Sequence, residues 1–210
     1  MTPPRAALDA LGLSERLLER MVQVRRHLHA HPELSNKERA TQCYLRDELA
    51  AETIPGVRDA AETGLVVDVA GAAGPSNRAI AIRADIDALP IIEASGVPFT
   101  SQNPGVMHAC GHDAHSAMVF ATAAALHATR HSFSGTVRLI FQPAEEAEPL
   151  GGRRIVESGL LDDVEAAIGI HVDPYLPVGQ VALDGGPYTL ASDIFDIVLS
   201  GRSAHAAKPA

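Results

Sequence analysis

The stretch Met107–Ser116, with the sequence MHACGHDAHS, holds the densest collection of reactive side chains in the chain. Three histidines, one thiol and one carboxylate fall within ten residues, and these are the groups that bind zinc or manganese. Cys110 and His112 are separated by one glycine, so they can hold one ion or lie on either side of an ion pair. A helix start with Asp113 in its first turn explains part of the stretch, but the density of the cluster favours a metal site.

Two adjacent carboxylates, Glu145 and Glu146, follow the apolar run that ends at Phe141. Two neighbouring acids repel each other, and both ionise comfortably only when a cation lies beside them. Adjacent residues on a turn point in different directions, so one carboxylate can bind metal while the other holds a water molecule. A solvated acidic loop that also contains Glu148 explains the pair equally well when it is considered alone.

Further polar residues stand at the ends of other apolar runs. Asp85 and Asp87 follow such a run, and a charge at the end of a buried strand must be paired or bound. Arg83 could pair with one of them as a purely structural bridge. His171 ends another apolar run, and His205 lies in a loop of small residues; each of these, taken singly, is more often structural.

The elements that must position these groups alternate between two periodicities. Helical spacing predicts helices over 14–29, 37–51, 113–129 and 153–158, and short apolar runs predict strands over 64–70, 79–84, 136–141 and 166–171. This alternation predicts an α/β fold whose mostly parallel sheet is sandwiched by helices. In such sheets the chemistry collects beyond the carboxyl ends of the strands, where the candidate residues stand.

A second domain is predicted to begin near the end of the chain. Turn residues cluster over 184–190, and an alternating pattern typical of a half-buried strand follows over 193–200. We therefore predict a catalytic domain over 1–188 and the start of a second domain over 189–210, which the family resemblance described below implies is a smaller α+β domain.

Composition excludes several classes of partner. The net charge is −9, aromatic residues make up 4% of the chain and Trp is absent, which argues against nucleic acid as a ligand. The two cysteines, Cys43 and Cys110, form no disulfide framework and suit a reducing compartment. No apolar run reaches the roughly 18 residues of a membrane span, so the sequence predicts a cytoplasmic protein without membrane contact.

Six motifs in order give the chain a family resemblance. They are RRHLHAHPELSNKE (25–38), RADIDALPI (83–91), MHACGHDAHSAM (107–118), FQPAEE (141–146), GIHVDP (169–174) and GRSAHAAKP (201–209). Together they resemble the metallopeptidase family of aminoacylase and carboxypeptidase G. The match is nearest to its amidohydrolase branch, which includes hippurate hydrolases and plant auxin-conjugate hydrolases.

The resemblance implies two divalent metal ions, Mn²⁺ or Zn²⁺, and a role for each matching residue. The implied metal ligands are Cys110, His112, Glu146 and His171. Glu145 would be the general base, and Asp87 would orient a ligand from outside the metal shell. His205 would reach the site from a lid and dimerisation domain, often from the partner subunit of a homodimer, to hold substrate or the developing oxyanion.

The predicted function is hydrolysis of the amide bond of N-acyl amino acids, such as N-acetyl or N-benzoyl (hippurate) compounds, by a metal-activated water. A dipeptidase or carboxypeptidase of the same family is one alternative, and a non-catalytic metal-binding remnant is another. The family's last metal ligand is a His near the end of a chain of nearly twice this length. We therefore expect a truncated chain that is itself poorly active or inactive.

Overall fold

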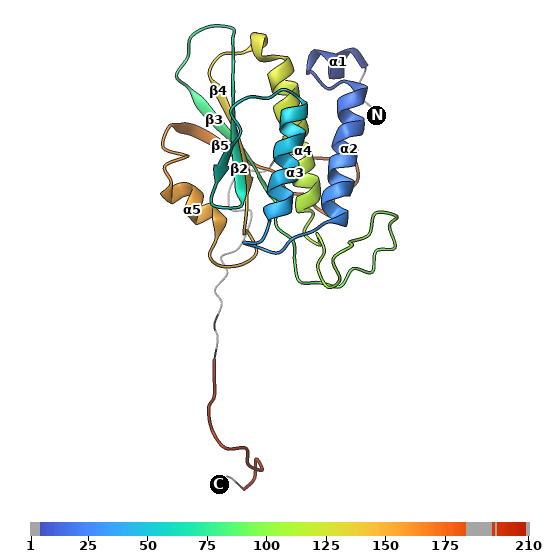
Figure 1. The fold of residues 1–210 in the computed structure, drawn as a ribbon, viewed down its shortest axis with the longest axis vertical. Helices are drawn as coiled ribbons and strands as arrows, with labels where there is room; N and C mark the ends of the chain where they lie inside the picture. The colour runs from blue at the N-terminus through green and yellow to red at the C-terminus, as the bar shows by residue number, and fades with distance from the viewer. Residues whose placement is uncertain (1–4, 184–194, 196, 209–210) are drawn as a thin grey trace. The chain divides into compact units, whose positions relative to one another are not determined.

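The computed structural model describes residues 5–183, 195 and 197–208. The chain divides into two compact units, 1–174 and 175–210. All the helices and strands of the described chain belong to the first unit, which Figure 1 shows as a sheet flanked by helices.

The sheet has five strands in the order β1-β2-β4-β3-β5. Their bounds are β1 Arg58–Ala60, β2 Gly64–Ala70, β3 Ala79–Asp85, β4 Thr136–Gln142 and β5 Val164–Gly169. Strand β3 runs parallel to both β4 and β5, whereas β2 runs antiparallel to β1 and to β4. The sheet is therefore mixed: the predicted parallel arrangement is confirmed for β3, β4 and β5, and β2 runs in the opposite direction. The connection from β2 to β3 is too short for the crossover of about a dozen residues that parallel strands need.

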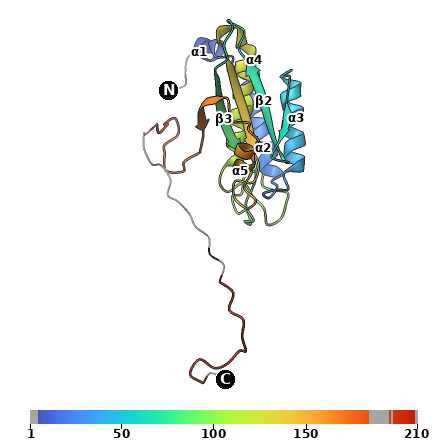
Figure 2. The ribbon, with the colours of Figure 1, turned by 90° about the vertical axis from the view of Figure 1, so that its left-hand side faces the viewer.

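Helices cover both faces of this sheet, as predicted. Their bounds are α1 Arg5–Ala10, α2 Glu15–Ala30, α3 Arg39–Ala51, α4 His112–Ala128, α5 Gly151–Glu157 and the 3-10 helix η1 Arg130–Ser132. Helices α2, α3 and α4 lie together on one face, and α5 lies on the other (Figures 1 and 2). The strands alternate accordingly: Leu65 and Val67 join the core under α2–α4, whereas Val66 packs with Ile155 of α5.

The predicted helices and strands of the first unit are confirmed to within two residues at each boundary. Ser14 caps α2, because its Oγ accepts a hydrogen bond from the Leu17 N–H at 3.2 Å. Helix α1, strand β1 and η1 were not predicted; β1 and η1 have three residues each, which is too short to show a period.

The second unit is described in part. The strand predicted over 193–200 includes positions 193, 194 and 196, which lie outside the described residues, and residues 195 and 197–200 form no strand. A turn closes at Lys208, whose N–H donates to the His205 carbonyl at 2.8 Å. The boundary at 188 stays a prediction. Among the described helices, none is long and apolar enough to cross a membrane.

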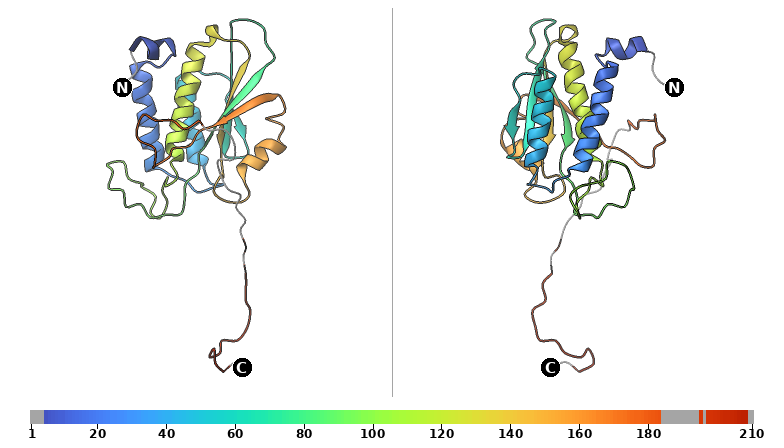
Figure 3. Two further views of the ribbon diagram at one scale, coloured as in Figure 1. Left: turned by 180° about the vertical axis from the view of Figure 1, so that it is seen from behind. Right: turned by 45° about the vertical axis from the view of Figure 1, so that its right-hand side comes forward.

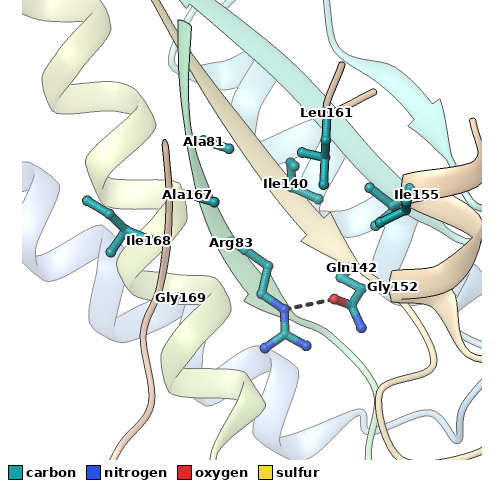
Figure 4. A pocket seen from close by; sticks show the side chains of 11 residues that line it. Ala81, Arg83, Ile140, Gln142, Gly152, Ile155, Leu161, Ala167, Ile168 and Gly169 are labelled. Carbon is teal, nitrogen blue, oxygen red and sulfur yellow. Dashed lines mark hydrogen bonds between the residues drawn. The ribbon is translucent and has the colours of Figure 1, made fainter. Parts of the chain in front are cut away.

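An apolar hollow of about 410 Å³ lies between α5 and the sheet (Figure 4). Ile140, Ile155 and Ile168 contribute to its walls, and Arg83 stands at one end, where its Nε donates to Gln142 Oε1 at 2.9 Å. The described residues that line it include no acid, histidine or cysteine. This hollow therefore lacks the side chains that bind metal ions.

The carboxyl ends of β3, β4 and β5 meet at one edge of the sheet, and α4 begins at the same edge (Figure 3). This places the segments that follow Asp85, Gln142 and Gly169 near His112, the first residue of α4. The fold thereby brings four predicted site segments together.

We expect the α4 side of the core to carry much of the stability of the first unit. Phe120 is fully buried there, so F120A should lower the free energy of unfolding by about 3–5 kcal/mol through lost burial and the cavity it leaves. The exposed Val156 of α5 is the control, and V156A should change stability by less than about 0.5 kcal/mol. Urea unfolding followed by circular dichroism measures both; equal small effects would contradict this description of the core.

Candidate metal centre

The four predicted metal ligands lie together at the carboxyl edge of the sheet. The ligand atoms of Cys110, His112 and Glu146 all lie within 4.8 Å of one another. His112 Nε2 is 3.7 Å from Glu146 Oε1, and Cys110 Sγ is 3.4 Å from His171 Nε2. The start of α4, the turn after β4 and the segment after β5 thus contribute to one cluster.

The histidine at the centre of this cluster presents a free lone pair when its ring is neutral. His112 Nδ1 lies 2.8 Å from the carbonyl oxygen of Asp87, which can only accept, so Nδ1 carries the proton. In the neutral ring Nε2 is then unprotonated, and it is buried without a hydrogen-bond partner among the described residues. Burial opposes the charged form of the ring, but the hydrogen bond to Asp87 and the charge of Asp85, whose Oδ2 lies 3.5 Å from Nε2, raise the pKa of His112. A buried imidazole nitrogen of this kind fits a metal ion, and a carbonyl on the opposite nitrogen is the usual support of a metal-binding histidine.

The charges of the cluster also fit a cation. Burial and the carboxylate of Glu146 raise the pKa of the Cys110 thiol to about 12. Burial and the neighbouring Glu145 raise the pKa of Glu146 as well. Both anionic forms are therefore less favourable here than in water, and a divalent ion would stabilise them by pairing with them. The thiol, imidazole and carboxylate donors together suit a borderline or soft divalent ion.

The turn that carries the two glutamates is held by the carboxylate of Asp87. Its Oδ2 accepts hydrogen bonds from the N–H groups of Glu145 and Glu146 at 2.9 and 3.0 Å, and from Ser35 Oγ at 2.7 Å. Asp87 also contacts the His112 ring, with Oδ1 3.3 Å from Nδ1. These are the contacts expected of a residue that orients metal ligands. The Ser35 contact was not predicted.

A second buried carboxylate supports the same turn. Glu38 is fully buried, and its Oε1 accepts the Ala144 N–H at 2.8 Å while its Oε2 accepts the Thr63 hydroxyl at 2.7 Å. Ala144 has a φ of +47°, a left-handed conformation that costs a non-glycine residue roughly 1 kcal/mol. The hydrogen bond from Glu38 holds the turn in this conformation.

The two glutamates point in different directions, as the sequence suggested. Glu146 is half-buried and lies in the cluster near His112, whereas Glu145 is exposed. Glu145 is thus open to water and substrate, and Glu146 is directed toward the candidate ion.

Asp85, His112 and His115 form a second close group, whose ligand atoms also lie within 4.8 Å of one another. Arg83 Nη1 donates to Asp85 Oδ2 at 2.7 Å, which is the structural bridge considered from the sequence. His115 Nδ1 lies 2.6 Å from Asp85 Oδ1. No role was predicted for His115, although its position three residues after His112 places both rings on one side of α4.

A cavity of about 450 Å³ opens beside Cys110 and His171. His108 lines it and is buried, and neither of its ring nitrogens has a hydrogen-bond partner among the described residues. Burial lowers the pKa of His108 to about 4, so the ring is neutral at pH 7. His29 lines the same cavity, where hydrogen bonds to Asp113 at 2.9 Å and to Glu93 at 3.0 Å outweigh the effect of burial and raise its pKa.

His205 belongs to the second unit. It is exposed, and its Nδ1 accepts a hydrogen bond from the Ala207 N–H at 3.2 Å. Its predicted role toward the substrate stays a prediction.

Known proteins similar to this chain include an amidohydrolase, a deacetylase and a metal-binding peptidase. Residues 81–202 match the model of peptidase family M20/M25/M40. The N-acetyl-L-cysteine deacetylase of Bacillus subtilis is 44% identical over 194 residues, which are 92% of this chain and 46% of that protein. The N-acyl-L-amino acid amidohydrolase of Geobacillus stearothermophilus is 40% identical over 185 residues, which are 88% of this chain and 50% of that protein.

One solved structure resembles this chain in both fold and sequence. The YXEP protein of Bacillus subtilis, described as a dinuclear metal binding peptidase of the M20 family, superposes with a TM-score of 0.74 at 45% identity. The match covers 79% of this chain and 46% of the other. This chain spans about half the length of the curated relatives it matches.

Asp87 should make the stability of the first unit depend on pH in the acid range. Burial opposes its charged form, but hydrogen bonds from His112, Ser35 and the backbone lower its pKa to about 2, below the roughly 3.9 of an unfolded chain. The stabilisation is therefore complete above about pH 5 and is lost as the pH falls through about 2.

We accordingly expect D87N to lower the free energy of unfolding by about 1–3 kcal/mol at pH 7, and the difference from the parent chain to shrink toward pH 2. Urea unfolding of the metal-free protein between pH 7 and pH 2 measures this. D47N, at an exposed position, is the control and should show little difference at any pH. A D87N difference that stays constant down to pH 2 would contradict the argument.

Proposed function

Because the chain belongs to peptidase family M20/M25/M40, we propose that it carries the site of a metal-dependent amidohydrolase that cleaves the amide bond of N-acyl amino acids. The observation that supports this most directly is the cluster of Cys110, His112 and Glu146, with the buried free lone pair of His112 Nε2 at its centre. The named activities of the deacetylase and amidohydrolase relatives support the substrate class.

The proposed site holds two divalent ions, either Mn²⁺ or Zn²⁺. Cys110, His112, Glu146 and His171 are the residues of this chain that would hold them. Such ions polarise a carbonyl oxygen and supply an activated water, effects together worth several kcal/mol of transition-state stabilisation. The thiol favours a thiophilic ion and the carboxylate suits Mn²⁺.

Glu145 is proposed as the general base and acid. Its exposed carboxylate takes a proton from the attacking water as the water oxygen bonds to the amide carbon. When the C–N bond breaks, Glu145 returns that proton to the leaving amine, and the products are a carboxylic acid and an amino acid. Asp87 contributes by fixing the N–H groups of Glu145 and Glu146, and His205 is proposed to hold substrate or the developing oxyanion.

The cavity beside Cys110 and His171 is large enough for part of a small substrate, since ligand pockets begin at roughly 300 Å³. Its walls combine the neutral His108 with the charged Arg25 and Asp113. We propose that it accepts a polar part of the acyl amino acid. The homodimer and the cytoplasmic location expected from the sequence remain predictions.

Exchange of single carboxylates for amides separates the proposed roles of the two glutamates. E145Q should reduce kcat by about 10²- to 10⁴-fold, because only the proton transfer is lost, and should leave the metal content unchanged. E146Q should reduce the metal content itself. E148Q, in the same turn region, is the matched control and should change neither. Loss of metal from E145Q, or full turnover by it, would contradict the assignment.

The reaction class is tested by amine release from N-acetyl, N-benzoyl and N-indoleacetyl amino acids and from simple dipeptides. We expect cleavage of acyl amino acids with Mn²⁺ or Zn²⁺ and none with a chelator. Preferential cleavage of dipeptides would favour a dipeptidase or carboxypeptidase. Metal binding without cleavage of any compound would favour the non-catalytic alternative.

A further inference from the structure

A buried row of hydrogen bonds runs behind the candidate metal ligands. Asp85 Oδ1 lies 2.6 Å from His115 Nδ1, and His115 Nε2 lies 2.9 Å from the backbone nitrogen of Val172. Asp85 is 1% exposed and His115 is 0% exposed. The row therefore connects the end of β3, through α4, to the segment that carries His171.

The direction of these hydrogen bonds fixes the protonation of the His115 ring. The Val172 N–H can only donate, so His115 Nε2 is an unprotonated acceptor. Nδ1 of the neutral ring then carries the proton and donates a hydrogen bond to Asp85. Both nitrogens are occupied, so His115 has no lone pair for an ion, even though Asp85, His112 and His115 lie within 4.8 Å of one another.

The segment after β5 is seated closely against the start of α4. Gly111 has a φ of +86°, and a Cβ at this position would lie 2.4 Å from Val172 Cγ2. The missing side chain allows Val172 to approach, and His171 then reaches Cys110, with Nε2 3.4 Å from Sγ. Strand β5 is an edge strand, mostly exposed from Glu165 to Gly169, so it supplies little packing to fix this segment.

We propose that His115 is a positioning residue that holds His171 against Cys110 through the Val172 N–H, without binding metal itself. Asp85 contributes by keeping the proton on His115 Nδ1, so that Nε2 stays an acceptor. The proposal rests on the proposed function only in taking Cys110 and His171 as metal ligands.

Two substitutions distinguish the roles of the two ring nitrogens of His115. A glutamine side chain reaches about as far as Nε2 and can accept the Val172 N–H, whereas asparagine reaches only about as far as Nδ1. H115N should weaken Co²⁺ binding by about 10- to 100-fold, as loss of a ligand's supporting hydrogen bonds typically does. H115Q should stay within about threefold of the parent chain.

Co²⁺ titration of the unmodified chain and both variants measures the affinity, and absorption from the Cys110 thiolate bound to Co²⁺ reports on the ligand pair directly. Circular dichroism and thermal unfolding verify that each variant is folded. Equal large losses in H115N and H115Q would show that an acceptor for the Val172 N–H does not account for the effect of His115, and would overturn the proposal. Parent-like binding by both would overturn it as well. Absence of Co²⁺ binding by the unmodified chain would instead reject the proposed function, and the positioning role with it.

A measurement on the unmodified chain avoids any effect of substitution on folding. Nitrogen-15 NMR of the histidine rings should show His115 protonated on Nδ1 and unprotonated on Nε2, both without metal and after addition of Zn²⁺. A change of the Nε2 resonance to that of a metal-bound nitrogen would overturn the proposal.

Discussion

The carboxylate of Asp87 is the constraint on which the arrangement of the candidate site depends. One oxygen accepts hydrogen bonds from Ser35 and from the N–H groups of Glu145 and Glu146. The backbone carbonyl of the same residue accepts a hydrogen bond from Nδ1 of His112. One residue just after β3 thereby contacts three separate parts of the chain: the segment before α3, the turn after β4 and the start of α4. A buried carboxylate needs such hydrogen-bond donors to stay ionised. The same hydrogen bonds that keep Asp87 ionised therefore also fix the geometry of the site.

A second constraint is electrostatic. The fold places Cys110 and Glu146 close to Glu145, and burial together with neighbouring charge raises the pKa values of Cys110 and Glu146. A protein gains nothing in stability from such a group of acids unless a cation pairs with them. The buried lone pair of His112 points the same way. A bound divalent ion would therefore offset the free-energy cost of placing these groups together.

Much of this could be predicted from the sequence, because strand ends and helix starts are local features. The β3–β4–β5 part of the sheet follows the rule that the carboxyl ends of parallel strands meet at one edge, and that rule was enough to gather Asp87, Glu146 and His171. The direction of β2 was missed because an apolar run carries no sign of its orientation. The supporting contacts of Glu38 with Ala144 and of Ser35 with Asp87 join residues 106 and 52 positions apart, and spacing along the chain does not show such pairs.

The histidines of α4 show why residue type and spacing stop short of assigning roles. His112 and His115 are three residues apart, both are buried, and both lie near Asp85. They differ in the partner that each ring meets. An acceptor, the Asp87 carbonyl, receives a hydrogen bond from Nδ1 of His112, and in the neutral ring this leaves Nε2 free for an ion. A donor, the Val172 N–H, occupies Nε2 of His115. Whether an imidazole can bind metal or instead orients its neighbours is thus decided by one backbone group, which only the folded chain brings into contact.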